Sequence, residues 1–130
     1  MVIDTSALVA LLTLEPEVVR MAQAIEDDAV RLVSAATLLE ASIVIETRHG
    51  EPAARELDLL LARADMQVSP VTAEQAEIAR QAWRRFGKGR HSAGLNYGDC
   101  FSYALSKASG ESLLFKGEDF SNTDVAAVRY

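Results

Sequence analysis

The stretch MVIDTSALVALLTL (1–14) combines a short apolar strand with the start of a helix. The strand ends at Asp4, the only charged residue of the stretch, and Thr5 or Ser6 can cap the helix that follows. A strand that passes directly into an apolar helix is typical of a βαβ unit, in which ligands bind beyond the carboxyl ends of the strands. The stretch therefore predicts that Asp4 lies at the ligand-binding edge of a parallel sheet.

The remainder of the chain repeats this pattern of short strands separated by one or two helices. We expect further strands at 30–34, 66–69, 112–115 and 126–129. We expect helices at 16–27, 35–48, 52–64, 73–86 and 97–108. The 130 residues, 49% of them hydrophobic, suffice for one compact domain over residues 1–130. The predicted fold class is α/β, a three-layer α/β/α arrangement with a small, mainly parallel sheet flanked by helices.

Three acidic residues stand alone in apolar stretches that otherwise have the composition of a core. Asp4 is the first, Glu40 lies in LVSAATLLEASIVI (32–45), and Asp99 lies in LNYGDCFSYALS (95–106). A carboxylate buried in such surroundings loses several kcal/mol of hydration, so it must be protonated, paired with a base or bound to a metal. These stretches contain no Lys or Arg, and the parallel topology brings all three acids to one edge. One shared divalent cation is therefore the favoured partner.

The segment LLFKGEDFSNTD (113–124) adds further acids at the same edge. Asp119 is the preferred fourth acid because Phe120 can anchor the turn in the core, while Glu118 and Asp124 stay open as alternatives. Taken singly, each acid also has an ordinary explanation. An Asp after a strand commonly caps a helix, an Asp in a first helical turn is favoured by the helix dipole, and a Glu inside a helix can belong to an exposed strip.

An all-oxygen site of this kind suits Mg²⁺ or Mn²⁺, which bind phosphate oxygens and can activate a water to hydrolyse a phosphodiester. We also expect a polar helper, Ser6 or Thr5, that can hydrogen-bond a carboxylate or the attacking water. The predicted metal-binding and catalytic carboxylates are Asp4, Glu40, Asp99 and Asp119.

The formal net charge of −6 is unusual for a protein that binds nucleic acid. Cations held among the carboxylates would reduce the repulsion, and local basic residues can still contact phosphates. The densest basic stretch is 84–91, where Lys88 and Arg90 are the better candidates to steer an RNA backbone. The single cysteine, Cys100, and the absence of an uncharged run of ~18 residues predict a cytoplasmic protein without membrane contact.

Four of these motifs together resemble the PIN-domain ribonuclease toxins of bacterial VapBC toxin–antitoxin pairs. They are VIDTSA (2–7), LLEAS (38–42), NYGDCFSYALS (96–106) and LLFKGEDFSNTD (113–124). The resemblance implies a PIN-like fold, a Mg²⁺- or Mn²⁺-dependent endoribonuclease, a homodimer, and inhibition by a cognate VapB-type antitoxin. It also implies an acidic quartet formed by Asp4, Glu40, Asp99 and Asp119, with Thr5 or Ser6 beside it.

The first helices offer an apolar face for such a partner. Leu8, Leu11 and Leu12, together with the helix that starts at Pro16, give more apolar surface than a small sheet covers. We expect part of this face to meet an antitoxin helix or a second copy of the chain.

Two other functions stay open. A metal-dependent aspartyl phosphatase also uses an acid after a parallel strand, but it needs a second acid two positions later, where Ser6 stands. A non-catalytic module that binds nucleic acid or protein can use the same fold, since fold does not fix function. The complete acidic set argues against such a module.

Overall fold

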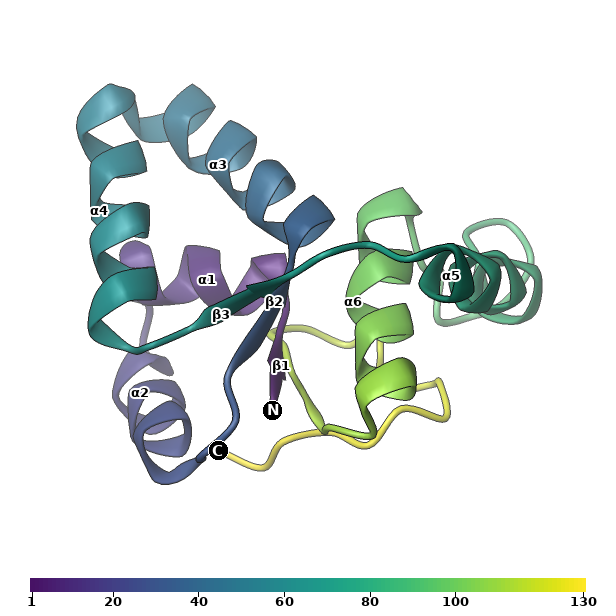
Figure 1. Ribbon diagram of the computed structural model, residues 1–130. Coiled ribbons are helices and arrows are strands. Elements are labelled where there is room, and N and C mark those ends of the chain that lie inside the picture. The colour runs from purple at the N-terminus through teal and green to yellow at the C-terminus, as the bar shows by residue number, and fades with distance from the viewer.

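Four parallel strands form the centre of the computed structural model, which describes residues 1–130 (Figure 1). Their order in the sheet is β3-β2-β1-β4, so the first strand lies between the second and the last. The strands are β1 (Val2–Ile3), β2 (Leu32–Ser34), β3 (Gln67–Ser69) and β4 (Leu113–Leu114). The predicted parallel sheet is confirmed, and each strand lies inside or coincides with part of its predicted range.

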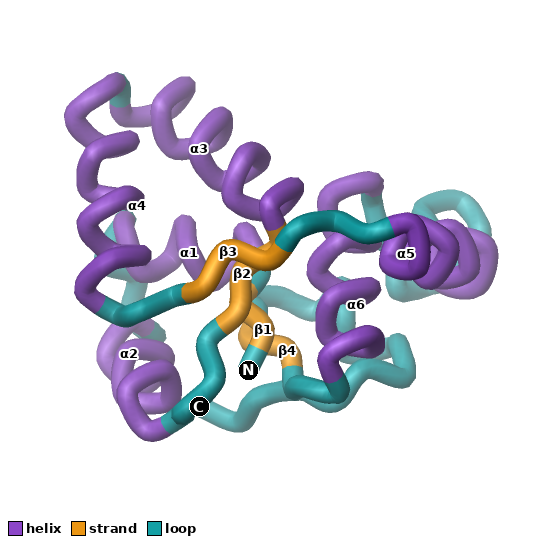
Figure 2. The backbone as a smooth tube through the Cα atoms, in the orientation of Figure 1, coloured by secondary structure: helices purple, strands orange, loops and turns teal.

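Six helices cover the two faces of this sheet, as Figure 2 shows. Helices α1 to α4 lie on one side, and α5 and α6 lie on the other. Their bounds are α1 (Thr5–Leu12), α2 (Val18–Asp27), α3 (Ala35–His49), α4 (Glu51–Arg63), α5 (Ala73–Phe86) and α6 (Tyr97–Ser109). The three-layer α/β/α arrangement is therefore confirmed. None of these helices is both long and apolar enough to span a bilayer.

Two hydrophobic cores, one on each face of the sheet, hold the layers together. Neighbouring residues of a strand point to opposite faces. Ile3 and Leu114 accordingly pack into the core under α1 to α4, whereas Val2 and Leu113 pack into the core under α5 and α6. All four are fully buried. This two-sided burial explains why the strands are apolar throughout instead of alternating with polar residues.

Some local predictions were wrong. The cap of α1 is Asp4, whose side chain accepts the N–H of Ser6, so neither Thr5 nor Ser6 serves as the cap. The expected strand at 126–129 is reduced to a single parallel bridge from Ala127, because its partner β4 has only two residues with which to form a ladder.

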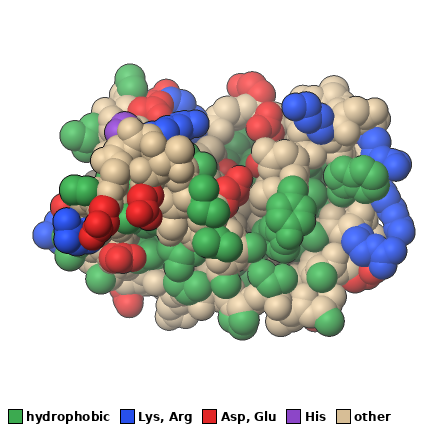
Figure 3. All heavy atoms as spheres, turned by 90° about the horizontal axis from the view of Figure 1, so that it is seen from above, with side chains coloured by type: hydrophobic (Ala, Val, Ile, Leu, Met, Phe, Trp, Pro, Cys, Tyr) green, Lys and Arg blue, Asp and Glu red, His purple; other side chains and the backbone are tan.

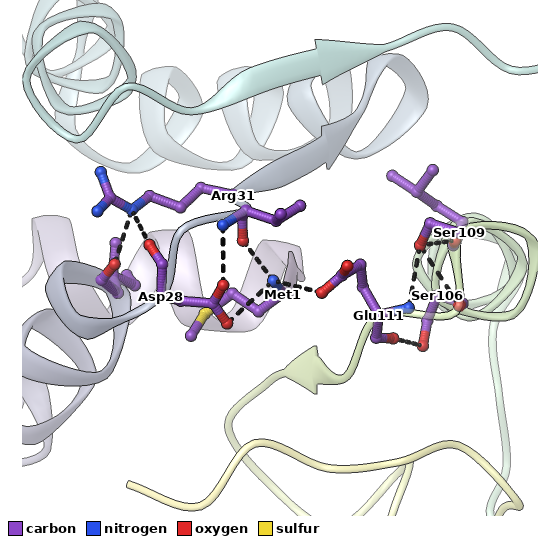
Figure 4. A network of polar contacts seen from close by, with 9 residues as sticks. Met1, Asp28, Arg31, Ser106, Ser109 and Glu111 are labelled. Carbon is purple, nitrogen blue, oxygen red and sulfur yellow. Dashed lines mark hydrogen bonds and ion pairs between the residues drawn. The ribbon is translucent and has the colours of Figure 1, made fainter.

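A polar network joins three segments at the amino edge of the sheet (Figure 4). The amino group of Met1 donates to Asp28 Oδ2 and to Glu111 Oε2, each at 3.1 Å, and also to the carbonyl of Val30. The N–H of Val30 also holds the pKa of Asp28 below its usual value, with help from the Met1 ammonium. These bonds connect the start of β1 to the residues that lead into β2 and β4. They help to fix the relative positions of the three strands.

Arg31 extends this network to the helical layer, and its loss should destabilise the fold. Its guanidinium donates to the carbonyls of Ile25 at 2.7 Å, Asp28 at 2.9 Å and Ala64 at 2.9 Å, which lie at or near the carboxyl ends of α2 and α4. We expect Arg31→Met to lower the free energy of unfolding in urea by about 2 kcal/mol, because these carbonyls lose charged donors. Arg55→Met, which removes only an exposed ion pair, should cost less than about 0.5 kcal/mol. Equal losses in the two variants would contradict this role.

Candidate active site

A pocket of about 450 Å³ brings the predicted acids together at the carboxyl edge of the sheet. Its lining includes Asp4, Glu40, Asp99 and Asp119, which come from four separate segments of the chain. Seen from above in Figure 3, acidic side chains lie in a hollow between two raised parts of the surface. The four acids that we expected to meet at one edge of the sheet therefore line one pocket there.

Asp4 is held by two serine hydroxyls from different parts of the chain. Ser6 Oγ donates to Oδ2 of Asp4 at 2.6 Å, and Ser102 Oγ donates to Oδ1 at 2.6 Å. The N–H of Ser6 donates to Oδ2 as well, at 2.9 Å. Asp4 is only 3% exposed, so these bonds replace most of the water that its carboxylate would otherwise contact.

Glu40 reaches the pocket from the second turn of α3. Thr5 Oγ1 donates to its Oε2 at 2.8 Å, which ties the first helix of the chain to the third. The carboxylate lies directly over Gly98 of α6, where any Cβ would overlap it. The space that Gly98 leaves empty is thus the space that the Glu40 carboxylate occupies, a close approach that only glycine permits.

Asp99 belongs to the capping box that starts α6. Its Oδ2 accepts the N–H of Asn96 at 2.8 Å, and its own N–H donates to Asn96 Oδ1 at 2.9 Å. The pKa of Asp99 is raised to about 7, chiefly by burial; the Asn96 N–H opposes this shift, and the nearby charges of Asp4, Asp119 and Glu40 add to it. The carboxyl of Asp99 is therefore half protonated near neutral pH when no cation is bound.

Asp119 lies on the exposed turn after β4, and it is the acid of that segment that lines the pocket. Phe120 is buried beside it, with its ring 5.1 Å from that of Phe115, as the predicted anchor requires. Glu118 does not line the pocket. Asp124 lies elsewhere, where it accepts the hydroxyl of Tyr103 and forms ion pairs with basic residues of α5 and α6.

The densest basic stretch of the sequence does not supply the basic residues of the pocket. The stretch 84–91 does not reach it; within that stretch, the guanidinium of Arg90 lies 4.1 Å from the ring centre of Trp83. Lys116 lines the pocket but forms ion pairs with Glu15 and Glu17. Arg48 was missed, although it lies eight residues after Glu40, a spacing that places both on one face of α3.

The acids suit a hard divalent cation by their chemistry. Four carboxylates and several hydroxyls offer oxygen atoms as ligands, and the nearby acids contribute to the raised pKa of Asp99, so a bound cation would relieve repulsion in the pocket. In the present conformation, no three of these side chains are arranged so that they could hold an ion. Asp4, Glu40 and Asp99 instead satisfy hydrogen bonds to their own surroundings, so binding an ion requires the side chains to turn inward.

Known proteins match this sequence over nearly the whole chain. A sequence model of the family described as PIN domain matches residues 1–126. The chain is 64% identical over 128 residues to the ribonuclease VapC of Mycolicibacterium smegmatis, with 98% of this chain and 99% of that relative covered. It is 61% identical over 128 residues to the ribonuclease VapC30 of Mycobacterium tuberculosis, with 98% of each covered.

Solved structures share the fold at lower identity. VapC20 of Mycobacterium tuberculosis, described as a sarcin-ricin loop cleaving toxin, superposes with a TM-score of 0.80 at 22% identity, covering 99% of this chain and 98% of that one. A toxin–antitoxin complex from Klebsiella pneumoniae gives a TM-score of 0.71 at 18% identity, covering 99% and 97%.

The raised pKa of Asp99 predicts how stability depends on pH when metal is removed. Between pH about 4 and about 7 the folded protein holds this proton more tightly than the unfolded chain, so the free energy of unfolding falls as the pH rises. We expect this decline in EDTA from pH 5 to pH 8. Asp99→Asn, which still accepts the Asn96 N–H, should flatten the decline and raise the melting temperature at pH 8 by about 5 °C. Glu118→Gln should follow the wild-type curve, and an unchanged slope in Asp99→Asn would refute the assignment.

Proposed function

Because the chain belongs to the PIN-domain family and, within it, to the VapC ribonucleases, we propose that it is a divalent-metal-dependent endoribonuclease and the toxin of a type II toxin–antitoxin pair. The observation that carries this function is the single pocket lined by Asp4, Glu40, Asp99 and Asp119. We propose Mg²⁺ or Mn²⁺ as the cation, since both prefer carboxylate oxygens and bind phosphates.

The residues of the pocket divide into acids that would hold the cation and hydroxyls that position those acids. When bound, such a cation activates a water and stabilises the charge that develops on the phosphate. Ser6 and Ser102 hold the two oxygens of Asp4, and Thr5 holds Glu40. Ser6 also accepts the N–H of Lys116 at 2.9 Å, which links the turn after β4 to the start of α1. We therefore assign Ser6 a positioning role instead of direct contact with the attacking water.

The alternatives lack support at the site. A phosphatase that forms an aspartyl phosphate on Asp4 needs an acid where Ser6 stands, and the hydroxyl of Ser6 is already committed to Asp4. A binding module without catalysis gives no reason to crowd four acids into one pocket, since their mutual repulsion destabilises the fold. Hydrolysis of an RNA phosphodiester accounts for both features.

The relationship to the VapC ribonucleases also supports a protein partner. A toxin–antitoxin complex is among the structures with this fold, and we propose that a cognate VapB-type antitoxin inhibits the chain. We further propose that residues 1–130 act as one domain, because a single sheet separates the two cores. RNA as the substrate would place this activity in the cytoplasm.

The apolar face expected on the first helices is only partly buried, since Val19 of α2 is 75% exposed, and a second exposed apolar face lies elsewhere. Leu8 and Leu11 lie inside the core. This second face contains Leu39 and Ile43 of α3, Trp83 of α5, and Tyr97 with the half-buried Phe101 of α6, and we name it the Tyr97 face. Figure 3 shows hydrophobic side chains on both sides of the acidic hollow.

We propose that the Tyr97 face joins two copies of the chain into a homodimer. Tyr97 is 82% exposed and stands between two apolar hollows of about 470 and 430 Å³, both of which it lines together with Phe101. A ridge flanked by hollows can fit a second copy of itself across a two-fold axis. The second hollow also contains Glu40, so the dimer would lie close to the catalytic pocket.

The ribonuclease function predicts cleavage that depends on both the cation and the acids. We expect the purified protein to cleave cellular RNA with Mg²⁺ or Mn²⁺, EDTA to stop it, and Asp99→Asn to reduce the rate by at least about a thousandfold, because a charged ligand is lost. Gel analysis of RNA fragments measures the rate, and circular dichroism checks the fold.

A matched pair on the turn after β4 provides the control. Asp119→Asn should lower the rate strongly, whereas Glu118→Gln removes the neighbouring charge outside the pocket and should leave it near wild type. Full activity in folded Asp99→Asn would refute the mechanism. Release of phosphate from a small ester without RNA cleavage would favour the phosphatase instead.

The proposed dimer predicts a change of molar mass when charge is placed on the Tyr97 face. We expect the wild type to elute as a dimer in light-scattering chromatography and Tyr97→Glu to elute as a monomer, because the substitution buries an unpaired carboxylate. Val19→Glu on α2, where Val19 is 75% exposed, is the matched control and should stay dimeric. A monomeric wild type, or a dimeric Tyr97→Glu, would exclude this interface.

A further inference from the structure

We propose that Arg48 forms a phosphate-binding subsite at the end of the catalytic pocket, where it holds an RNA phosphate next to the one that is cleaved. Arg48 and Lys116 are the two basic residues that line the pocket. Lys116 is neutralised by its ion pairs with Glu15 and Glu17. The guanidinium of Arg48 forms no ion pair, hydrogen bond or aromatic contact, so it is the cation of the pocket that is free for a ligand.

The position of Arg48 on α3 separates it from the acids. Glu40, Val44 and Arg48 follow one another at intervals of four residues, which places all three on the face of the helix that lines the pocket. Eight residues of helix correspond to about 12 Å along the axis. Arg48 therefore lies two turns away from the acid that would hold the cation, at a place suited to a neighbouring phosphate instead of the scissile one.

The chemistry of the pocket explains why a cation is needed there. A pocket with this excess of carboxylates repels an RNA backbone, and a bound metal offsets the charge only around the acids themselves. A guanidinium can donate two parallel hydrogen bonds to phosphate oxygens, which both attracts the chain and fixes its path. This subsite rests on the proposed function, since it presumes that RNA occupies the pocket.

The ordinary explanation for Arg48 is its place in the last turn of α3, where the helix dipole favours a positive charge. Arg63 provides the matched control, because it is an exposed residue without an ion pair in the last turn of α4 and does not line the catalytic pocket. Removing either residue changes the net charge and the helix end in the same way. Only Arg48 should affect RNA.

The test measures binding of a short fluorescent single-stranded RNA by anisotropy at several salt concentrations, with Mg²⁺ and in the Asp99→Asn background. We expect Arg48→Ala to weaken binding about tenfold at low salt and to reduce the slope of log affinity against log salt by about 0.7, the change for one phosphate contact. Arg48→Lys should restore the slope but only part of the affinity, because an ammonium does not bind phosphate bidentately. Arg63→Ala should match the parent in both.

The outcomes separate this subsite from the proposed function. Equal effects of Arg48→Ala and Arg63→Ala, an unchanged salt slope, or a parent that does not bind RNA would overturn the subsite. An effect of Arg48→Ala on the molar mass or on antitoxin binding alone would overturn it too. Failure of the wild type to cleave RNA, with the Arg48-dependent salt slope intact, would instead contradict the ribonuclease function and leave the subsite standing.

Kinetics provide a second readout. In the wild type that cleaves RNA, Arg48→Ala should raise KM about tenfold and change kcat less than about twofold, as expected when a residue binds the substrate and the transition state equally.

Discussion

Four carboxylates that share one pocket repel one another, and much of the surrounding structure serves to keep them there. Asp4 and Asp99 each accept a backbone N–H in the cap of a helix, at the amino ends of α1 and α6. The positive ends of these two helix dipoles therefore point toward the acids and offset part of their charge. Serine and threonine hydroxyls supply the remaining hydrogen bonds. Burial and, to a smaller extent, the neighbouring acids still raise the pKa of Asp99, so a bound cation would stabilise its charged form.

The hydrogen bonds that cap α1 and α6 also place Asp4 and Asp99 at the pocket. A role in helix capping and a role in the site are therefore compatible for both residues. A short strand that is buried on both faces delivers Asp4 to the edge of the sheet, where α1 begins at once. The capping box does the same for Asp99 at the start of α6. Because the caps place these two residues at the edge of the sheet, the site is positioned by elements that the fold requires in any case.

The sequence allowed most of the fold to be predicted, because apolar runs and helix caps are local signals. The helix Ala73–Phe86 has the predicted bounds, with Thr72 as its cap. What could not be predicted depends on tertiary packing. The segment LLEASIVI is apolar around α3, so its pattern does not reveal that Leu39 and Ile43 are exposed, and Leu8 is buried only because the neighbouring helices cover α1. The acids could be named in advance because each stands alone in an apolar stretch, whereas the only sequence signal for Arg48 was its spacing of eight residues from Glu40 on the same helix.

The net charge of this protein is a poor guide to what it binds, because many of its charged side chains form ion pairs within the chain. Away from the pocket, Lys107 and Arg85 pair with Asp124, and at the pocket Lys116 pairs with Glu15 and Glu17, which leaves Arg48 as the basic residue of the pocket lining without an ion pair. Acids outnumber bases along the pocket lining. A polyanion can enter such a place favourably only when a cation accompanies it, since the cation converts the acids from a repulsive surface into ligands. Metal and RNA should therefore bind as coupled events, each improving the affinity for the other.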